Sequence, residues 1–220
     1  MSLDSILDTI TKSILPAGML AIAANVCVMA EEVVEAPRKP TLEQVTKGTE
    51  INDNKENKAE DGRDYVKEFQ EKLKDVKIPE LKDASAYNNA GHRAMRSGDL
   101  LQAAKLLYRA MELDSEKFSV YMNLGTVYCK LGEQTRGSEV KMYLSHSLDL
   151  YNTCLDKISK TNYLTETQRN ENLTLAHEGK ATILYALGDK VHAKDSILLA
   201  AKYGKLTEKG TLLYSELNGK

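Results

Sequence analysis

Residues 86–114 read AYNNAGHRAMRSGDLLQAAKLLYRAMELD, and their pattern returns in VYMNLGTVYCKLGE, residues 120–133. Tyr87 and Tyr121, and likewise Gly91 and Gly125, are separated by the same 34 positions. A third copy, HEGKATILYALGDKVHAKDSILLAAKYG, occupies residues 177–204. Small and large apolar residues alternate in each copy at helical spacing, which predicts pairs of closely packed helices.

The size of the residues predicts how the two helices of each copy pack. Gly91, Gly125 and Ala181 allow a close approach from the first helix. The second helix supplies Ala103, Ala110, Ala193 and Ala200, and the larger residues Tyr87, Leu107, Tyr121, Tyr128 and Ile197 fill the remaining space. Glycine followed by an acid at 98–99, 132–133 and 188–189 predicts the end of each first helix, because glycine adopts the left-handed turn without steric cost.

A unit of 34 residues built as helix–turn–helix resembles the tetratricopeptide repeat. The resemblance implies an all-α fold, an α-solenoid of about three tetratricopeptide-like hairpins spanning residues 84–204, with flanking capping helices. It also implies that the first helices line a groove that holds a peptide or protein partner.

The second copy departs from this spacing. The small residue of its second helix should fall at Gly137, but Ser147, Tyr151 and Cys154 fit the packing positions better. This predicts about ten extra residues between the two helices, which lengthen the second helix rather than form a loose loop. A further insertion, residues 159–172, separates the second and third copies.

Residues 1–30 are a possible signal peptide or membrane anchor helix. Residues 14–30 contain no charged side chain, and Val28 and Ala30 suit a cut after Ala30. The same segment is about long enough to cross a bilayer, and it also fits a folded core helix. The first two alternatives predict an exported (periplasmic or secreted) or membrane-anchored protein. The third leaves an intracellular or organellar complex.

The remaining segments flank the repeats. Residues 31–62 are polar and charged, which predicts a disordered linker. Residues 63–80 predict an amphipathic capping helix with Tyr65, Phe69, Leu73 and Val76 on one face, either packed beside the first repeat or free for a partner. Residues 205–220 predict a C-terminal capping helix and tail.

Composition and motifs argue against several classes of function. With 30 Lys and Arg against 32 Asp and Glu, the net charge of −2 does not suit a nucleic-acid binder. No catalytic, metal-binding or cofactor-binding motif is recognisable, so we expect no enzyme. Cys129 and Cys154 fall at packing positions, where buried free thiols are the ordinary outcome and a disulfide is the alternative.

The resemblance gives candidate partner-binding residues. Position six of the first helix, which commonly faces the groove, is Asn89 in the first copy and Asn123 in the second, and Gly179 breaks the series in the third. An asparagine side chain both donates and accepts, so it can bind a peptide backbone. The neighbouring candidates are Asn88, His92, Ser119, Met122 and Thr126. The sequence thus predicts a non-enzymatic module that holds a protein or peptide partner, with self-association open. The alternative is a structural subunit whose N-terminal segment inserts into a membrane or a neighbouring subunit.

Overall fold

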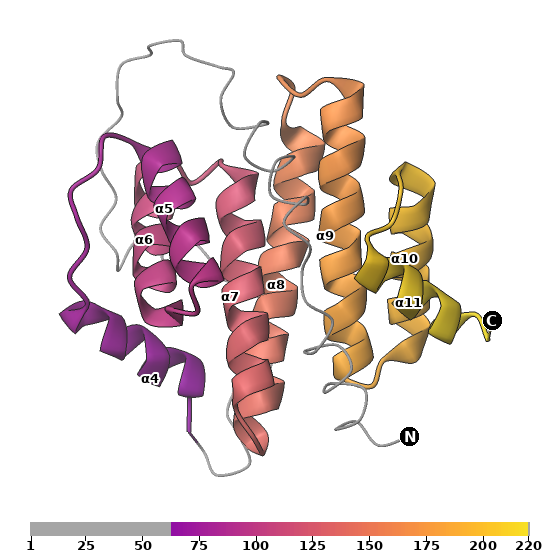
Figure 1. Cartoon of the computed structure of the whole chain (residues 1–220), viewed down its shortest axis with the longest axis horizontal. Helices are drawn as coiled ribbons and strands as arrows, with labels where there is room; N and C mark the ends of the chain where they lie inside the picture. Colours follow the sequence, from indigo (N-terminus) through magenta and orange to yellow (C-terminus); the bar gives the residue numbers. More distant parts are fainter. Residues whose placement is uncertain (1–62, 220) are drawn as a thin grey trace. The chain divides into compact units, whose positions relative to one another are not determined.

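The computed structural model describes residues 63–219, and within them the fold is all-helical (Figure 1). The predictions for residues 1–30 and 31–62 lie outside the described residues. The helices are α4 (Tyr65–Lys72), η1 (Leu73–Asp75), α5 (Ala84–Arg96), α6 (Leu100–Leu113), α7 (Phe118–Gln134), α8 (Ser138–Lys160), α9 (Glu166–Ala186), α10 (Lys190–Tyr203) and α11 (Glu208–Leu217). Across residues 63–219, no helix has the length and apolar character needed to cross a bilayer.

The helices pack as three successive pairs, α5 with α6, α7 with α8, and α9 with α10. The first helices also contact one another in order, α5 with α7 and α7 with α9. In Figure 1 the pairs follow one another from α5 to α10. The predicted all-α arrangement of repeated hairpins with a helix at each end is confirmed.

Local chemistry sets the helix ends. The carboxylates of Asp83, Asp99 and Asp189 each accept a bond from a backbone N–H in the first turn of α5, α6 and α10. Such caps satisfy donors that the helix itself leaves unpaired. Gly98 and Gly188 have φ angles of +85° and +86°, so these two predicted turns are confirmed.

Glycines set how closely the first two pairs pack. A Cβ at position 91 would lie 2.7 Å from Leu107 Cγ, and a Cβ at position 125 would lie 2.8 Å from the Tyr151 ring. Neither distance leaves room for a side chain. Leu107 and Tyr151 therefore occupy equivalent positions, as the shifted spacing of the second copy predicts.

The predicted turn at Gly132 is wrong. Gly132 lies inside α7, and the turn comes instead at Gly137, whose φ is +71°. A Cβ at residue 132 would sit 3.1 Å from two carbons of the Leu144 side chain, so this glycine serves close packing rather than chain reversal. The ten extra residues extend the hairpin, and α8 is one continuous helix of 23 residues, as predicted.

The insertion at residues 159–172 is mostly helix. α8 ends at Lys160, and α9 already begins at Glu166, where Thr165 and Gln168 form a reciprocal capping box. Arg169 donates to the carbonyl oxygens of Ile158 (2.7 Å) and Thr161, which lie at the end of α8. The guanidinium group thereby links the first turn of α9 to the last carbonyl oxygens of α8.

Gly179 explains why position six changes in the third copy. A Cβ at this residue would lie 2.3 Å from Tyr151 Cε1 and 2.4 Å from Cζ, inside the ring's contact distance. Tyr151 is buried, and its hydroxyl group is 3.0 Å from Thr126 Oγ1. Gly179 therefore makes room for a ring that fills the space between the second and third pairs.

The predicted N-terminal capping helix is shorter than residues 63–80, because helical structure ends at Asp75. Its side chains Tyr65, Phe69 and Leu73 are buried, and α4 contacts α8 while η1 contacts α6. Three buried large side chains contribute roughly 2 kcal/mol each. Two aromatic pairs and two hydrogen bonds contribute about 1 kcal/mol each. Ordering eleven residues costs about 1 kcal/mol each, so gain and cost nearly cancel.

At the C-terminal end, α11 contacts both α9 and α10. The carboxylate of Glu178 in α9 accepts from the backbone N–H and the hydroxyl of Thr207, both at 2.7 Å. A Cβ at Gly210 would lie 2.6 Å from the carboxylate carbon, so glycine leaves space for it. Burial raises the pKa of Glu178, while the Thr207 bonds oppose that rise.

Candidate partner-binding face

The residues that the sequence singled out lie on α5 and α7, and we refer to the surface they form as the first-helix face. Asn88 and Asn123 are directly linked, because the Asn123 amide donates to Asn88 Oδ1 at 2.9 Å. The Asn88 amide donates to Ser119 Oγ at 3.4 Å. Asn88 is only 2% exposed, so the bond donated by Asn123 satisfies a buried carbonyl oxygen and joins the first pair to the second.

The structure separates Asn89 from Asn123. Asn89 is exposed, whereas Asn123 is half-buried and bonded to Asn88. The two asparagines are therefore not equivalent, although their spacing suggests it. Because an amide nitrogen carries two N–H groups, the bond to Asn88 uses only one donor of Asn123.

His92 lies one turn beyond Asn88 on α5 and is half-buried. Burial and the neighbouring charges of Arg96 and Arg93 lower the pKa of His92. The ring is therefore neutral near pH 7, where it offers one donor and one acceptor rather than a charge.

Met122 and Thr126 continue the face along α7, and both are half-buried. Thr126 donates to the Met122 carbonyl oxygen at 3.0 Å and shares a hydrogen bond with Tyr151. The Thr126 hydroxyl is thus held in place by the Met122 carbonyl oxygen and the Tyr151 hydroxyl. The flexible thioether of Met122 offers an adaptable apolar contact.

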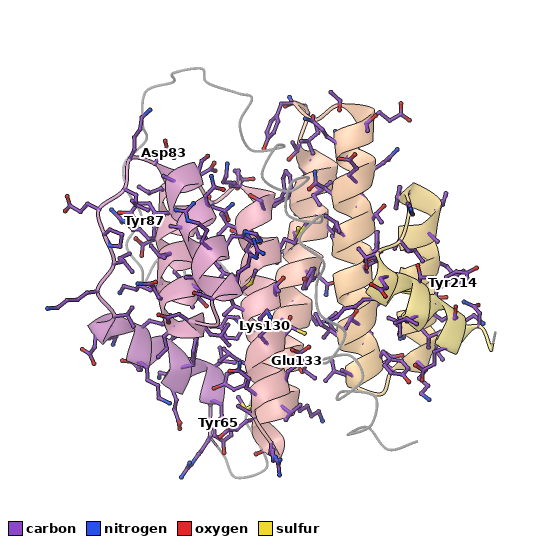
Figure 2. All side chains as sticks on the ribbon, in the orientation of Figure 1. Tyr65, Asp83, Tyr87, Lys130, Glu133 and Tyr214 are labelled. Carbon is purple, nitrogen blue, oxygen red and sulfur yellow. The ribbon has the colours of Figure 1, made fainter. Side chains whose placement is uncertain are left out.

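The first-helix face also has a charged end, which no motif in the sequence predicts. Lys130 and Glu133, in the last turns of α7, lie near Cys129 and are labelled in Figure 2. Lys209 of α11 also acts electrostatically on the Cys129 thiol, so the C-terminal helix comes near this end of α7. Only a three-dimensional arrangement could have shown this, because Lys209 is distant in sequence.

Within residues 63–219, Cys129 and Cys154 are both free thiols. Cys154 bonds to the backbone of Met122, and Cys129 lies seven residues further along α7, a rise of about 10 Å. That separation exceeds the span of a disulfide, so the alternative of a Cys129–Cys154 bond is wrong for this fold. Burial raises the pKa of each thiol to about 12, which keeps both protonated and weakly nucleophilic.

The third pair contributes differently. Glu178, in α9, is turned to Thr207 and α11, and Gly179 accommodates Tyr151. Leu175 is the exposed residue of this stretch, at 40%. The polar candidates therefore gather on α5 and α7 and do not extend along α9. Within residues 63–219, no group of His, Cys, Asp and Glu side chains is arranged to hold a metal ion.

Comparison with known proteins adds no assignment. No family model matches the chain, and no curated protein matches it.

Proposed function

We propose that this protein is a non-enzymatic, tetratricopeptide-like module that holds a peptide or protein partner on its first-helix face. The observation that carries the proposal is the set of polar side chains that bridges α5 and α7. Asn88, Asn123 and Ser119 form a bonded group, and Asn89, which follows Asn88 in α5, is exposed. A preorganised group of amides binds a peptide backbone without a large ordering cost.

The face has the chemistry of a neutral peptide site. Asn89 and His92 supply donors and acceptors, and Met122 supplies an apolar contact. Thr126, whose hydroxyl group is hydrogen-bonded to Tyr151, adds a polar group one turn after Met122 in α7. These groups suit the backbone and apolar side chains of an extended segment better than they suit a strongly charged ligand.

A second candidate function is a fixed structural subunit of a larger complex. It is favoured by apolar side chains left exposed on the last helices, where Val191 is 72% and Leu212 56% exposed. Large apolar side chains left exposed can mark a protein contact when they form a patch. Export or membrane anchoring remains a prediction, since it depends on residues 1–30.

The test is a selection of peptides from a random library against the full chain, followed by titration of the selected peptides. Asn89→Ala and His92→Ala should each weaken binding by about tenfold, which is the loss of one or two hydrogen bonds. Asn152→Ala is the matched control, because Asn152 is an exposed asparagine on α8, a second helix. Failure to select any peptide, or equal affinity for all three variants and the wild type, would reject the proposal.

A further inference from the structure

α4 lies on an aromatic surface built from later parts of the chain. We call Tyr108 of α6, Tyr128 of α7 and Tyr143 of α8 the aromatic floor. The ring of Phe69 meets Tyr128 edge-on at a centroid distance of 5.6 Å and Tyr143 at 6.3 Å. Tyr65, Phe69 and Leu73 follow the spacing i, i+4 and i+8, so a single stripe of α4 and η1 makes the apolar contact.

The contact is also polar. The Gln70 amide donates to the Tyr108 hydroxyl at 2.9 Å, and that hydroxyl is 2.7 Å from the Tyr128 hydroxyl. The Tyr143 hydroxyl donates to the Tyr65 carbonyl oxygen at 3.3 Å. Tyrosine offers a rigid apolar ring with a polar tip, a combination that is common where proteins recognise partners.

α4 is weakly attached. A helix of eight residues does not persist alone in water, so α4 is helical because it is docked. Residues 76–83 connect it to α5 outside any helix, and none of them is fully buried. The Leu81 N–H donates to the Tyr87 hydroxyl at 3.0 Å, which fixes the connector next to α5. Between η1 and Leu81 the core cluster is contacted by the partly buried Ile78, so the contacts that hold the chain before Leu81 are mainly those of α4 and η1.

We propose that the aromatic floor is a recognition site for an amphipathic helix and that α4 is its built-in, displaceable occupant. The partner is a helix with an aromatic, an aromatic and an aliphatic residue at i, i+4 and i+8, and an amide side chain next to the central ring. This pattern of side chains is the one that α4 and η1 present to the aromatic floor. This site uses none of the residues of the first-helix face, so it does not depend on the function proposed above.

The experiment uses the full chain and a fluorescent peptide of residues 63–76, with fluorescence anisotropy as the readout. In the wild type, α4 competes for the floor and only the undocked fraction binds. If docking of α4 is favourable by about 1.4 kcal/mol, about a tenth of wild-type chains have the floor free, so Phe69→Ala in the chain should tighten binding of the peptide by up to about tenfold. The same peptide carrying Phe69→Ala should bind the variant chain poorly. A peptide carrying Lys67→Ala should bind normally, because Lys67 faces solvent.

Two outcomes would overturn the proposal. One is that the Phe69→Ala chain binds the peptide no better than the wild type. The other is that this chain loses the helical signal of α5 to α10, which would make α4 part of the cooperative core. Hydrogen exchange of the wild type gives an independent readout. Amides of α4 should exchange at least about a hundredfold faster than those of α6 and α8, and equal protection would refute displacement.

Discussion

Gly179→Ala tests whether the packing of the second pair against the third is as close as the structure indicates. Alanine is the better helix former by about 1 kcal/mol, so helix propensity alone predicts a more stable protein. Steric contact predicts the reverse, because the new methyl group would lie 2.3 Å from Tyr151 Cε1. The two effects have opposite signs, so the measurement decides between them.

The steric effect should be larger. Three atoms of Tyr151 lie within 2.7 Å of the added carbon, and ordinary contact between carbon atoms requires roughly 3.5 to 4 Å. The ring cannot swing aside freely, because it is buried and its hydroxyl is bonded to Thr126. Overpacking of this kind costs about 1 to 3 kcal/mol. The three close contacts place this variant at the upper end of that range, about 3 kcal/mol, so after the gain in propensity of about 1 kcal/mol we expect a net loss of about 2 kcal/mol.

The assay is urea unfolding followed by far-ultraviolet circular dichroism, supported by a thermal melt. A loss of about 2 kcal/mol corresponds to a decrease in Tm of roughly 4 to 8 °C for a protein of this size. In a Tyr151→Leu background the added methyl group has no ring to meet, so Gly179→Ala should then cause no loss. A more stable Gly179→Ala protein, or the same loss in both backgrounds, would show that the reasoning is wrong.

Two further predictions concern polar groups. Asn123→Ala should destabilise by about 1 to 2 kcal/mol in urea unfolding, because it leaves the buried Asn88 carbonyl oxygen without its donor. Asn88→Leu in the same variant should recover part of that loss, and strict additivity of the two changes would contradict the bond. Burial lowers the pKa of His146 to about 4, and its Nε2 is buried without a partner. Because the unfolded chain binds the proton near pH 6.5 and the folded chain near pH 4, stability should fall by about 3 kcal/mol as the pH drops through that interval. His146→Leu should show a smaller fall, and an unchanged pH dependence would assign the loss to other groups.

Much of the fold follows from spacing alone. Gly91 and Gly125 are one 34-residue period apart, and the apolar residues of each copy follow helical spacing, so the helix pairs and most of their packing positions could be predicted from the sequence. The turns at Gly98 and Gly188 were equally readable, because glycine before an acid has a local backbone reason. Gly132 also precedes an acid, so the same pattern predicted a turn there, and that prediction is wrong. The local signal is identical, and only the partner residue Leu144 shows that this glycine is inside a helix.

The site was less predictable. The 34-residue interval placed Asn89 and Asn123 at the same position of the repeat, yet the bond from Asn123 to Asn88 makes their surroundings different. Whether side chains on two helices form a hydrogen bond depends on the angle and the axial shift between the helices. The spacing of residues in the sequence does not give these quantities. The charge of Lys209 near Cys129 likewise arises from the placement of α11, which no local motif specifies.

The ten-residue lengthening of the second hairpin has a consequence for the start of the domain. Met142, Tyr143 and Leu144 all belong to the added turns of α8, and α4 rests partly on Tyr143. A hairpin of standard length would offer α4 no such support. The lengthened hairpin and the N-terminal helix therefore form a matched set. Deleting ten residues within 135–144 should undock α4 while leaving α5 and α6 folded, and related chains should carry both features or neither.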